Sequence, residues 1–207
     1  MASQEDIVPN DTRYVPLTQQ PYCCVPTCLQ MVMLRCGIPL VPQELMAHHM
    51  QITVPKEKKE LFWHIRSGTK RPKAGWGTQL NENATAEPMF AALNIPLAMS
   101  WHLIDTFAST NELLTYLACA EGAGKDIVIC FQNGAMYGTE DDGGHVCLLD
   151  RVDMQKRTVR FVDPGHNKPK WQTASISKLY KAMKAHGPDN MGGCWEVKKK
   201  TGKKQAS

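Results

Sequence analysis

The segment that most constrains the fold runs from Val25 to Arg35. It is apolar on nearly all of its faces, and a helix without a polar face belongs in the interior of a protein. Pro26 is compatible with the first turn of such a helix, and Cys36-Gly37 supplies a stop signal after it. The sequence therefore predicts a central buried helix, with Cys24 at or just before its N-terminus.

The second half of the chain changes from helical patterns to strand patterns. Apolar runs predict strands at 127–131, 145–152 and 158–162, and a short polar turn at 153–157 joins the last two as a hairpin. A last strand is expected at 194–197. Helices followed by antiparallel strands indicate an α+β fold. Further helices are predicted at 42–50, 85–93, 109–120 and 176–183.

The chain of 207 residues is expected to form one domain over 14–197, after a flexible N-terminus at 1–13. A disordered basic tail is predicted at 198–207. That tail holds five lysines and no acid, so the formal net charge of +4 falls to −1 without it. A basic tail on a neutral body does not predict nucleic-acid binding by the folded part.

The termini and the cysteines bear on the cellular compartment. The first residues are polar and acidic, unlike a secretory signal, and no apolar run approaches the roughly 18 residues of a membrane span. A cytoplasmic protein with no membrane partner is therefore expected, although secretion without a cleavable signal stays open. The eight cysteines are then expected to be reduced thiols. The sequence does not determine the oligomeric state.

Four side chains, in the order Gln19, Cys24, His145 and Asp163, indicate a thiol catalyst. A helix N-terminus and a nearby imidazolium both lower the pKa of a thiol, so Cys24 would be activated by its helix and by His145, which would act as base and then as acid. The predicted hairpin brings Asp163 beside His145, where it can orient the imidazole. The Cys24 backbone N–H and the Gln19 amide are candidate oxyanion donors.

Each of these residues also has an ordinary structural explanation, and only their combination favours catalysis. Cys23 and Gln20 are adjacent alternatives for the nucleophile and the oxyanion donor, whereas Cys28 is expected in the core. Cys23, Cys24 and Cys28 together do not have the spacing of a common zinc site. Neither a metal nor another cofactor is expected.

Three positions, one tryptophan and two glycines, are candidates for binding a peptide or protein substrate. Trp76 lies between two glycines and is either a packed loop anchor or a wall of the substrate cleft. Gly143 and Gly144 directly precede His145, where the absence of a side chain would allow the backbone of a peptide to approach.

Three short segments resemble the bacteriocin-processing peptidases, which cleave after a double-glycine leader, and their stand-alone relatives. Gln19 with Cys24-Val25-Pro26-Thr27-Cys28-Leu29 resembles the family's Gln and Asp-Cys-Gly-Pro-Ala-x-Leu pattern. Gly144-His145-Val146-Cys147-Leu148-Leu149 resembles Gly-His-x-Val-Val-Leu, and Val162-Asp163-Pro164 resembles the family's Asp-Pro segment. The resemblance implies a papain-like fold, a Cys-His-Asp triad and a Gln oxyanion donor at these positions.

The chain departs from that family pattern at several positions. Cys23 and Val25 stand where the family has Asp and Gly, and Gln19 is one position closer to the cysteine than is usual. The long interval between Cys24 and His145 predicts an insertion over about 51–120. A papain-like cysteine peptidase acting on a peptide or isopeptide bond through a thioester is the expected function. An acyltransferase, transglutaminase or deamidase with the same triad and a catalytically silent binding module are the alternatives.

Overall fold

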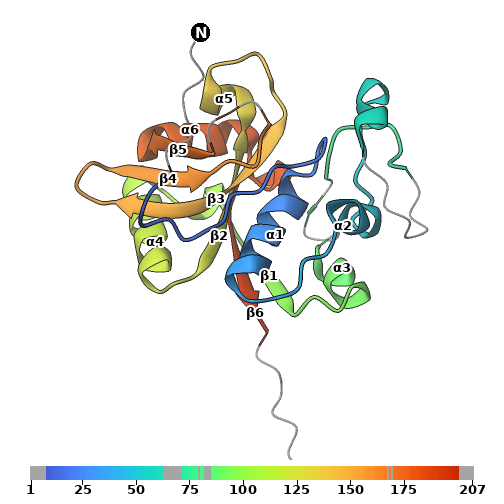
Figure 1. Cartoon of the computed structure of the whole chain (residues 1–207). Helices are drawn as coiled ribbons and strands as arrows, with labels where there is room; N and C mark the ends of the chain where they lie inside the picture. The colour runs from blue at the N-terminus through green and yellow to red at the C-terminus, as the bar shows by residue number, and fades with distance from the viewer. Residues whose placement is uncertain are drawn as a thin grey trace, which may run out of the picture.

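A six-stranded antiparallel sheet forms the centre of the fold (Figure 1). The computed structural model describes residues 8–62, 71–78, 80–81, 85–166, 168 and 170–200. The strand order is β1-β6-β2-β3-β4-β5. The strands are β1 (Leu97–Leu103), β2 (Asp126–Gln132), β3 (Gly144–Asp153), β4 (Thr158–Val162), β5 (Trp171–Ser175) and β6 (Gly193–Lys199).

Helices cover both faces of this sheet. On one side lie α1 (Cys24–Arg35), α2 (Gln43–His49) and α3 (Glu87–Ala92), and on the other lie α4 (Thr110–Gly122), α5 (Asn133–Tyr137) and α6 (Ile176–His186) (Figure 1). The expected α+β combination of helices with an antiparallel sheet is confirmed. Among the α-helices and strands of the described residues, α5, β1 and β5 were not predicted.

Alternating residues of the central strands divide between two hydrophobic cores. In β2, Val128 and Cys130 pack with α1, while Ile127, Ile129 and Phe131 pack with α4 and α6. Successive strand residues point to opposite faces of a sheet, so a strand covered on both sides is apolar throughout. This explains why β2 is buried over almost its whole length.

The predicted central helix is confirmed as α1. It begins at Cys24, and every residue from Val25 to Met33 is buried. Pro26 lies in its first turn, and Gly37 follows its end with a φ of +63°, a conformation that glycine adopts without strain. The helix thus presents the side chain of its first residue, Cys24, at one end of the sheet.

The predicted capping box of α4 is also confirmed. The Ser109 hydroxyl accepts a hydrogen bond from the Glu112 backbone N–H, and the Glu112 carboxylate accepts one from Ala108. The Ser109 hydroxyl therefore satisfies a free N–H group in the first turn of α4, and Glu112 reaches back to the residue just before the cap.

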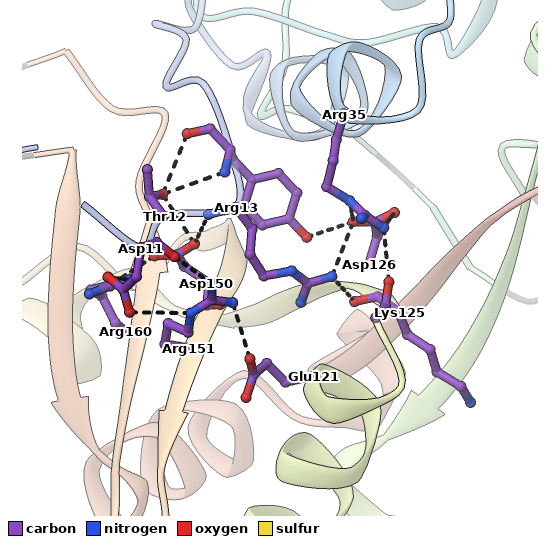
Figure 2. Close-up of polar contacts among 12 residues, drawn as sticks. Asp11, Thr12, Arg13, Arg35, Glu121, Lys125, Asp126, Asp150, Arg151 and Arg160 are labelled. Carbon is purple, nitrogen blue, oxygen red and sulfur yellow. Dashed lines mark hydrogen bonds and ion pairs between the residues drawn. The ribbon is translucent and has the colours of Figure 1, made fainter. Parts of the chain in front are cut away.

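The two ends of the expected domain are linked to the sheet by hydrogen bonds. Although residue 14 was the expected start, Thr12 and Arg13 already bind the buried carboxylate of Asp150 (Figure 2). At the other end, β6 continues to Lys199, and residues 201–207 of the expected basic tail lie outside the described residues. None of the helices within the described ranges is long and apolar enough to cross a membrane.

Candidate active site

The hairpin of β3 and β4 brings His145 and Asp163 together. Leu148 pairs with Val162 across the hairpin, so the start of β3 and the residue after β4 lie at the same end of the sheet. His145 Nε2 lies 2.8 Å from Asp163 Oδ1. The two residues are 8% and 0% exposed, so this contact is shielded from water. The hairpin predicted from the sequence brings these two residues side by side in the same way.

Asp163 accepts hydrogen bonds from three donors. Besides His145, the Gly165 backbone N–H donates to Oδ1 at 2.7 Å, and the Tyr137 hydroxyl donates to Oδ2. Burial alone would raise the pKa of Asp163, but the hydrogen bond and charge of His145, aided by Tyr137 and Gly165, hold this pKa well below its usual range. Asp163 is therefore a carboxylate throughout the physiological pH range.

His145 is poised to carry a positive charge. Burial lowers the pKa of His145, but interactions with the Asp163 carboxylate and with a negatively charged Cys24 sulfur outweigh it and raise the pKa to about 9. Since Nε2 bonds Asp163, the ring's other nitrogen, Nδ1, is left for the thiol. The site can hold an imidazolium between a carboxylate and a sulfur at neutral pH.

The neighbouring thiols occupy different surroundings. Cys24 is half-buried, whereas Cys23 is 0% exposed and belongs to a small apolar cluster. Burial raises the pKa of the Cys23 thiol, which keeps it protonated. Cys28 is fully buried within α1, and its sulfur lies 3.7 Å from the Val146 carbonyl oxygen. The partners of Cys23 are Ala47, Ile52, Val54 and Phe62.

The two adjacent glutamines also differ. The Gln19 backbone N–H donates to the Pro164 carbonyl at 2.9 Å, which places Gln19 next to Asp163. Its side-chain Oε1 is buried without a hydrogen-bond partner among the described residues. The Gln20 side chain instead donates to Glu44 on α2 at 3.3 Å. Gln19 is thus the glutamine attached to the His–Asp end of the sheet.

Trp76 lies beside the segment that leads into α1. Its side chain is 73% exposed and contacts the Tyr22 ring edge-to-face at 6.1 Å between centroids. A Cβ on Gly77 would lie 3.4 Å from that same ring. The Gly75-Trp76-Gly77 loop is therefore next to Tyr22, two residues before Cys24, and presents an indole to solvent.

Gly143 and Gly144 are exposed and lead directly into His145. The Gly143 backbone N–H donates to the Asp141 carboxylate at 2.9 Å. A Cβ on Gly144 would lie 2.5 Å from the His186 ring, so this position has no room for a side chain. Close approach of a substrate backbone stays a prediction here, and the packing of His186 is a second reason for glycine at position 144.

Two residues that touch the site, Tyr137 and Cys147, were not predicted from the sequence. In the part of the chain that the structure describes, His145, Cys147 and Asp163 bring three potential metal ligands within 4.8 Å. Burial, however, raises the pKa of the Cys147 thiol well above its usual range, and the histidine and carboxylate atoms already bond each other. The arrangement fits a hydrogen-bonded His–Asp pair better than a metal site.

Comparison with known proteins agrees with this arrangement. A model of the peptidase C39-like family matches residues 12–188, which confirms the family resemblance seen in the three sequence segments. None of the curated proteins matches the sequence.

Two solved structures show the same fold. The crystal structure of a protein described as a C39-like peptidase from Bacillus anthracis has a TM-score of 0.51 and 16% identity, and the match covers 93% of this chain and 100% of that one. Xylellain, a cysteine protease from Xylella fastidiosa, has a TM-score of 0.50 and 13% identity, and the match covers 96% of this chain and 85% of that one. At such identities the likeness supports the papain-like fold alone.

Proposed function

Because the chain belongs to the peptidase C39-like family, we propose that it is a cysteine peptidase that hydrolyses a peptide or isopeptide bond through a thioester on Cys24. The observation that carries the proposal is the 2.8 Å contact between His145 and the buried Asp163 carboxylate, together with the influence of Cys24 on the same imidazole, whose pKa it raises. In this proposal the proton of the thiol resides on His145, which gives a thiolate–imidazolium pair.

The proposed reaction begins when the Cys24 thiolate attacks the carbonyl carbon of the scissile bond. The carbonyl oxygen becomes an oxyanion, which the Cys24 backbone N–H and the Gln19 amide would stabilise. The C–N bond breaks as His145 gives its proton to the departing amine. Water then attacks the thioester with His145 as base, which releases a carboxylic acid and restores the thiol.

The surroundings of the sulfur atoms support Cys24 over Cys23. A nucleophile must be a thiolate and must be reached by substrate. Cys24 is partly exposed at the helix N-terminus, and it is close enough to His145 to raise the pKa of that imidazole. Cys23 packs inside an apolar cluster that favours the neutral thiol.

Trp76, Gly143 and Gly144 are proposed to bind the substrate. The exposed Trp76 ring and its contact with Tyr22 support a role as an apolar wall near Cys24. The two glycines precede His145 and are exposed, which supports close approach of a substrate backbone.

The proposal is tested by transfer of an acyl group from a peptide thioester probe, with the labelled residue identified by tandem mass spectrometry. The wild-type protein is expected to carry the acyl group on Cys24. Cys24→Ala should abolish labelling, and His145→Ala should slow it by about 100-fold or more, as expected for loss of a general base.

Cys23→Ala is the matched control, because it removes a thiol adjacent in sequence but buried elsewhere. Its labelling is expected to equal that of the wild type. Labelling that persists in Cys24→Ala and vanishes in Cys23→Ala would instead assign the nucleophile to the preceding residue.

A further inference from the structure

The short helix α5 is built to hold Tyr137 in one place. Gly138 ends the helix with a φ of +72°, and the loop after it folds back onto Gly134. A Cβ on Gly134 would lie 2.5 Å from the carbonyl oxygens of Thr139 and Asp141. The loop can close on the helix in this way because position 134 has no side chain.

The Tyr137 ring is contacted from several sides. It meets the rings of Phe131 and His145 at centroid distances of 6.1 and 6.4 Å. The Lys168 ammonium lies 3.3 Å from the centroid of the Tyr137 ring and also donates to the Asn133 side chain at 3.1 Å. A cation and the ring face below it attract each other electrostatically. The Tyr137 ring therefore has little freedom to turn away.

The Tyr137 hydroxyl donates to the Asp163 oxygen that faces away from His145. Oδ1 accepts from His145 and from Gly165, whereas Oδ2 accepts from Tyr137. Asp163 is 0% exposed, and a buried carboxylate oxygen without a donor is costly. If the carboxylate turned, it would lose the donors on both of its oxygens.

We infer that Tyr137 is a positioning residue of the Cys24–His145–Asp163 site, because its hydroxyl fixes the Asp163 carboxylate in the orientation that bonds His145. The inference rests on the proposed function, since it concerns the same site. Tyr137 touches none of the reacting atoms. It acts on Asp163, which in turn holds the imidazolium that stabilises the thiolate.

The test measures alkylation of Cys24 by iodoacetamide as a function of pH, with the modified cysteine identified by mass spectrometry. In the wild type, Cys24 is expected to react faster than an ordinary cysteine at pH 6, because the pKa of His145 of about 9 keeps a positive charge beside the sulfur until the pH rises through that value. An upper inflection in the pH dependence of the alkylation rate, near pH 9, should mark the loss of the proton from the His145 imidazolium.

Tyr137→Phe keeps the ring and removes the donor. A less firmly held Asp163 stabilises the imidazolium less, so the pKa of His145 falls toward its ordinary value. The alkylation rate at pH 6 is expected to fall about tenfold, consistent with loss of one hydrogen bond to a charged group. The upper inflection should move to lower pH by about half a unit or more, a change that a purely structural role would not cause.

Two further variants make the result specific. Tyr180→Phe removes a hydroxyl that donates to the Phe107 carbonyl at 2.9 Å and should leave both the rate and the inflection unchanged. In an Asp163→Asn background, Tyr137→Phe should cause little additional loss, because Tyr137 acts through Asp163.

The outcomes separate this inference from the proposed function. A reactive wild-type Cys24 whose rate and inflection are unchanged by Tyr137→Phe would overturn the inference alone, and so would a full additional loss in the Asp163→Asn background. A wild-type Cys24 that reacts at pH 6 no faster than an ordinary cysteine would overturn the proposed function, and the inference with it.

Discussion

Gln19 and Gln20 are neighbours with the same side chain, and their environments predict different consequences of mutation. Gln19 is bonded to the loop that follows Asp163, and Gln20 to α2. If Gln19 supplies an oxyanion donor, Gln19→Ala should lower kcat for peptide hydrolysis by about 100-fold, the usual cost of losing one such donor. KM should change little, and Gln20→Ala should stay near the wild-type rate.

Alkylation of Cys24 by iodoacetamide provides the control for this prediction. That reaction forms no oxyanion, so Gln19→Ala should leave its rate unchanged. A parallel fall in hydrolysis and alkylation would mean that Gln19 supports the structure around Cys24 and is not an oxyanion donor.

Residue-level assignments were predictable from the sequence only where local pattern decides them. The place of Cys24 at the start of α1 follows from the apolar run after it. The difference between Cys24 and Cys23 does not, because it depends on packing against residues such as Ile52 and Phe62, far away in the chain. Tyr137 was missed because a helix as short as α5 has no periodicity to recognise.

At the scale of elements, Asp126 connects the end of α1 and the N-terminal segment to the sheet. Its carboxylate accepts from Arg35 at 2.6 and 2.7 Å and from the Tyr14 hydroxyl at 2.7 Å (Figure 2). The Asp126 side chain is 4% exposed, and removing one partner of a shielded ion pair leaves the other uncompensated.

We therefore expect Asp126→Asn to lower the free energy of unfolding by about 2–3 kcal/mol, measured by urea denaturation. Asp153→Asn is the matched control, since Asp153 pairs with Lys156 on the exposed hairpin turn, where an ion pair contributes little. Its effect should not be measurable. Equal losses in both variants would contradict the anchoring role of Asp126.

The elements predicted from the sequence are those in which burial determines the pattern of apolar residues. The apolar runs of β2, β3 and β4 follow from their central place in a sheet with helices on both sides. The unpredicted strands β1 and β5 are the two edges of that sheet. An edge strand has a neighbouring strand on one side only. The residues of β1 and β5 are partly polar and partly exposed, and they show no clear alternation of buried and exposed positions.

At the scale of the whole molecule, the catalytic proposal depends on bringing together two parts of the chain that are far apart in the sequence. The α1 helix supplies Cys24 from the first part, and the β3–β4 hairpin supplies His145 and Asp163 from the second. The order of these residues and the hairpin could be read from the sequence. The helices predicted at 85–93 and 109–120 form α3 and α4, but the path of the polar residues at 51–83 could not be predicted, because polar segments carry little periodicity; both stretches lie within the range of about 51–120. Whether that range is an insertion relative to the family stays a prediction.

The most direct test of the account is whether the wild-type protein cleaves peptide bonds through Cys24. A peptide mixture would be incubated in ¹⁸O-labelled water with the wild type or with Cys24→Ala, and the products would be identified by mass spectrometry. The account predicts new amino termini and new ¹⁸O-labelled carboxyl termini with the wild type, and none with Cys24→Ala. Wild-type protein that leaves every peptide backbone intact, or that only transfers acyl groups to amines, would contradict it.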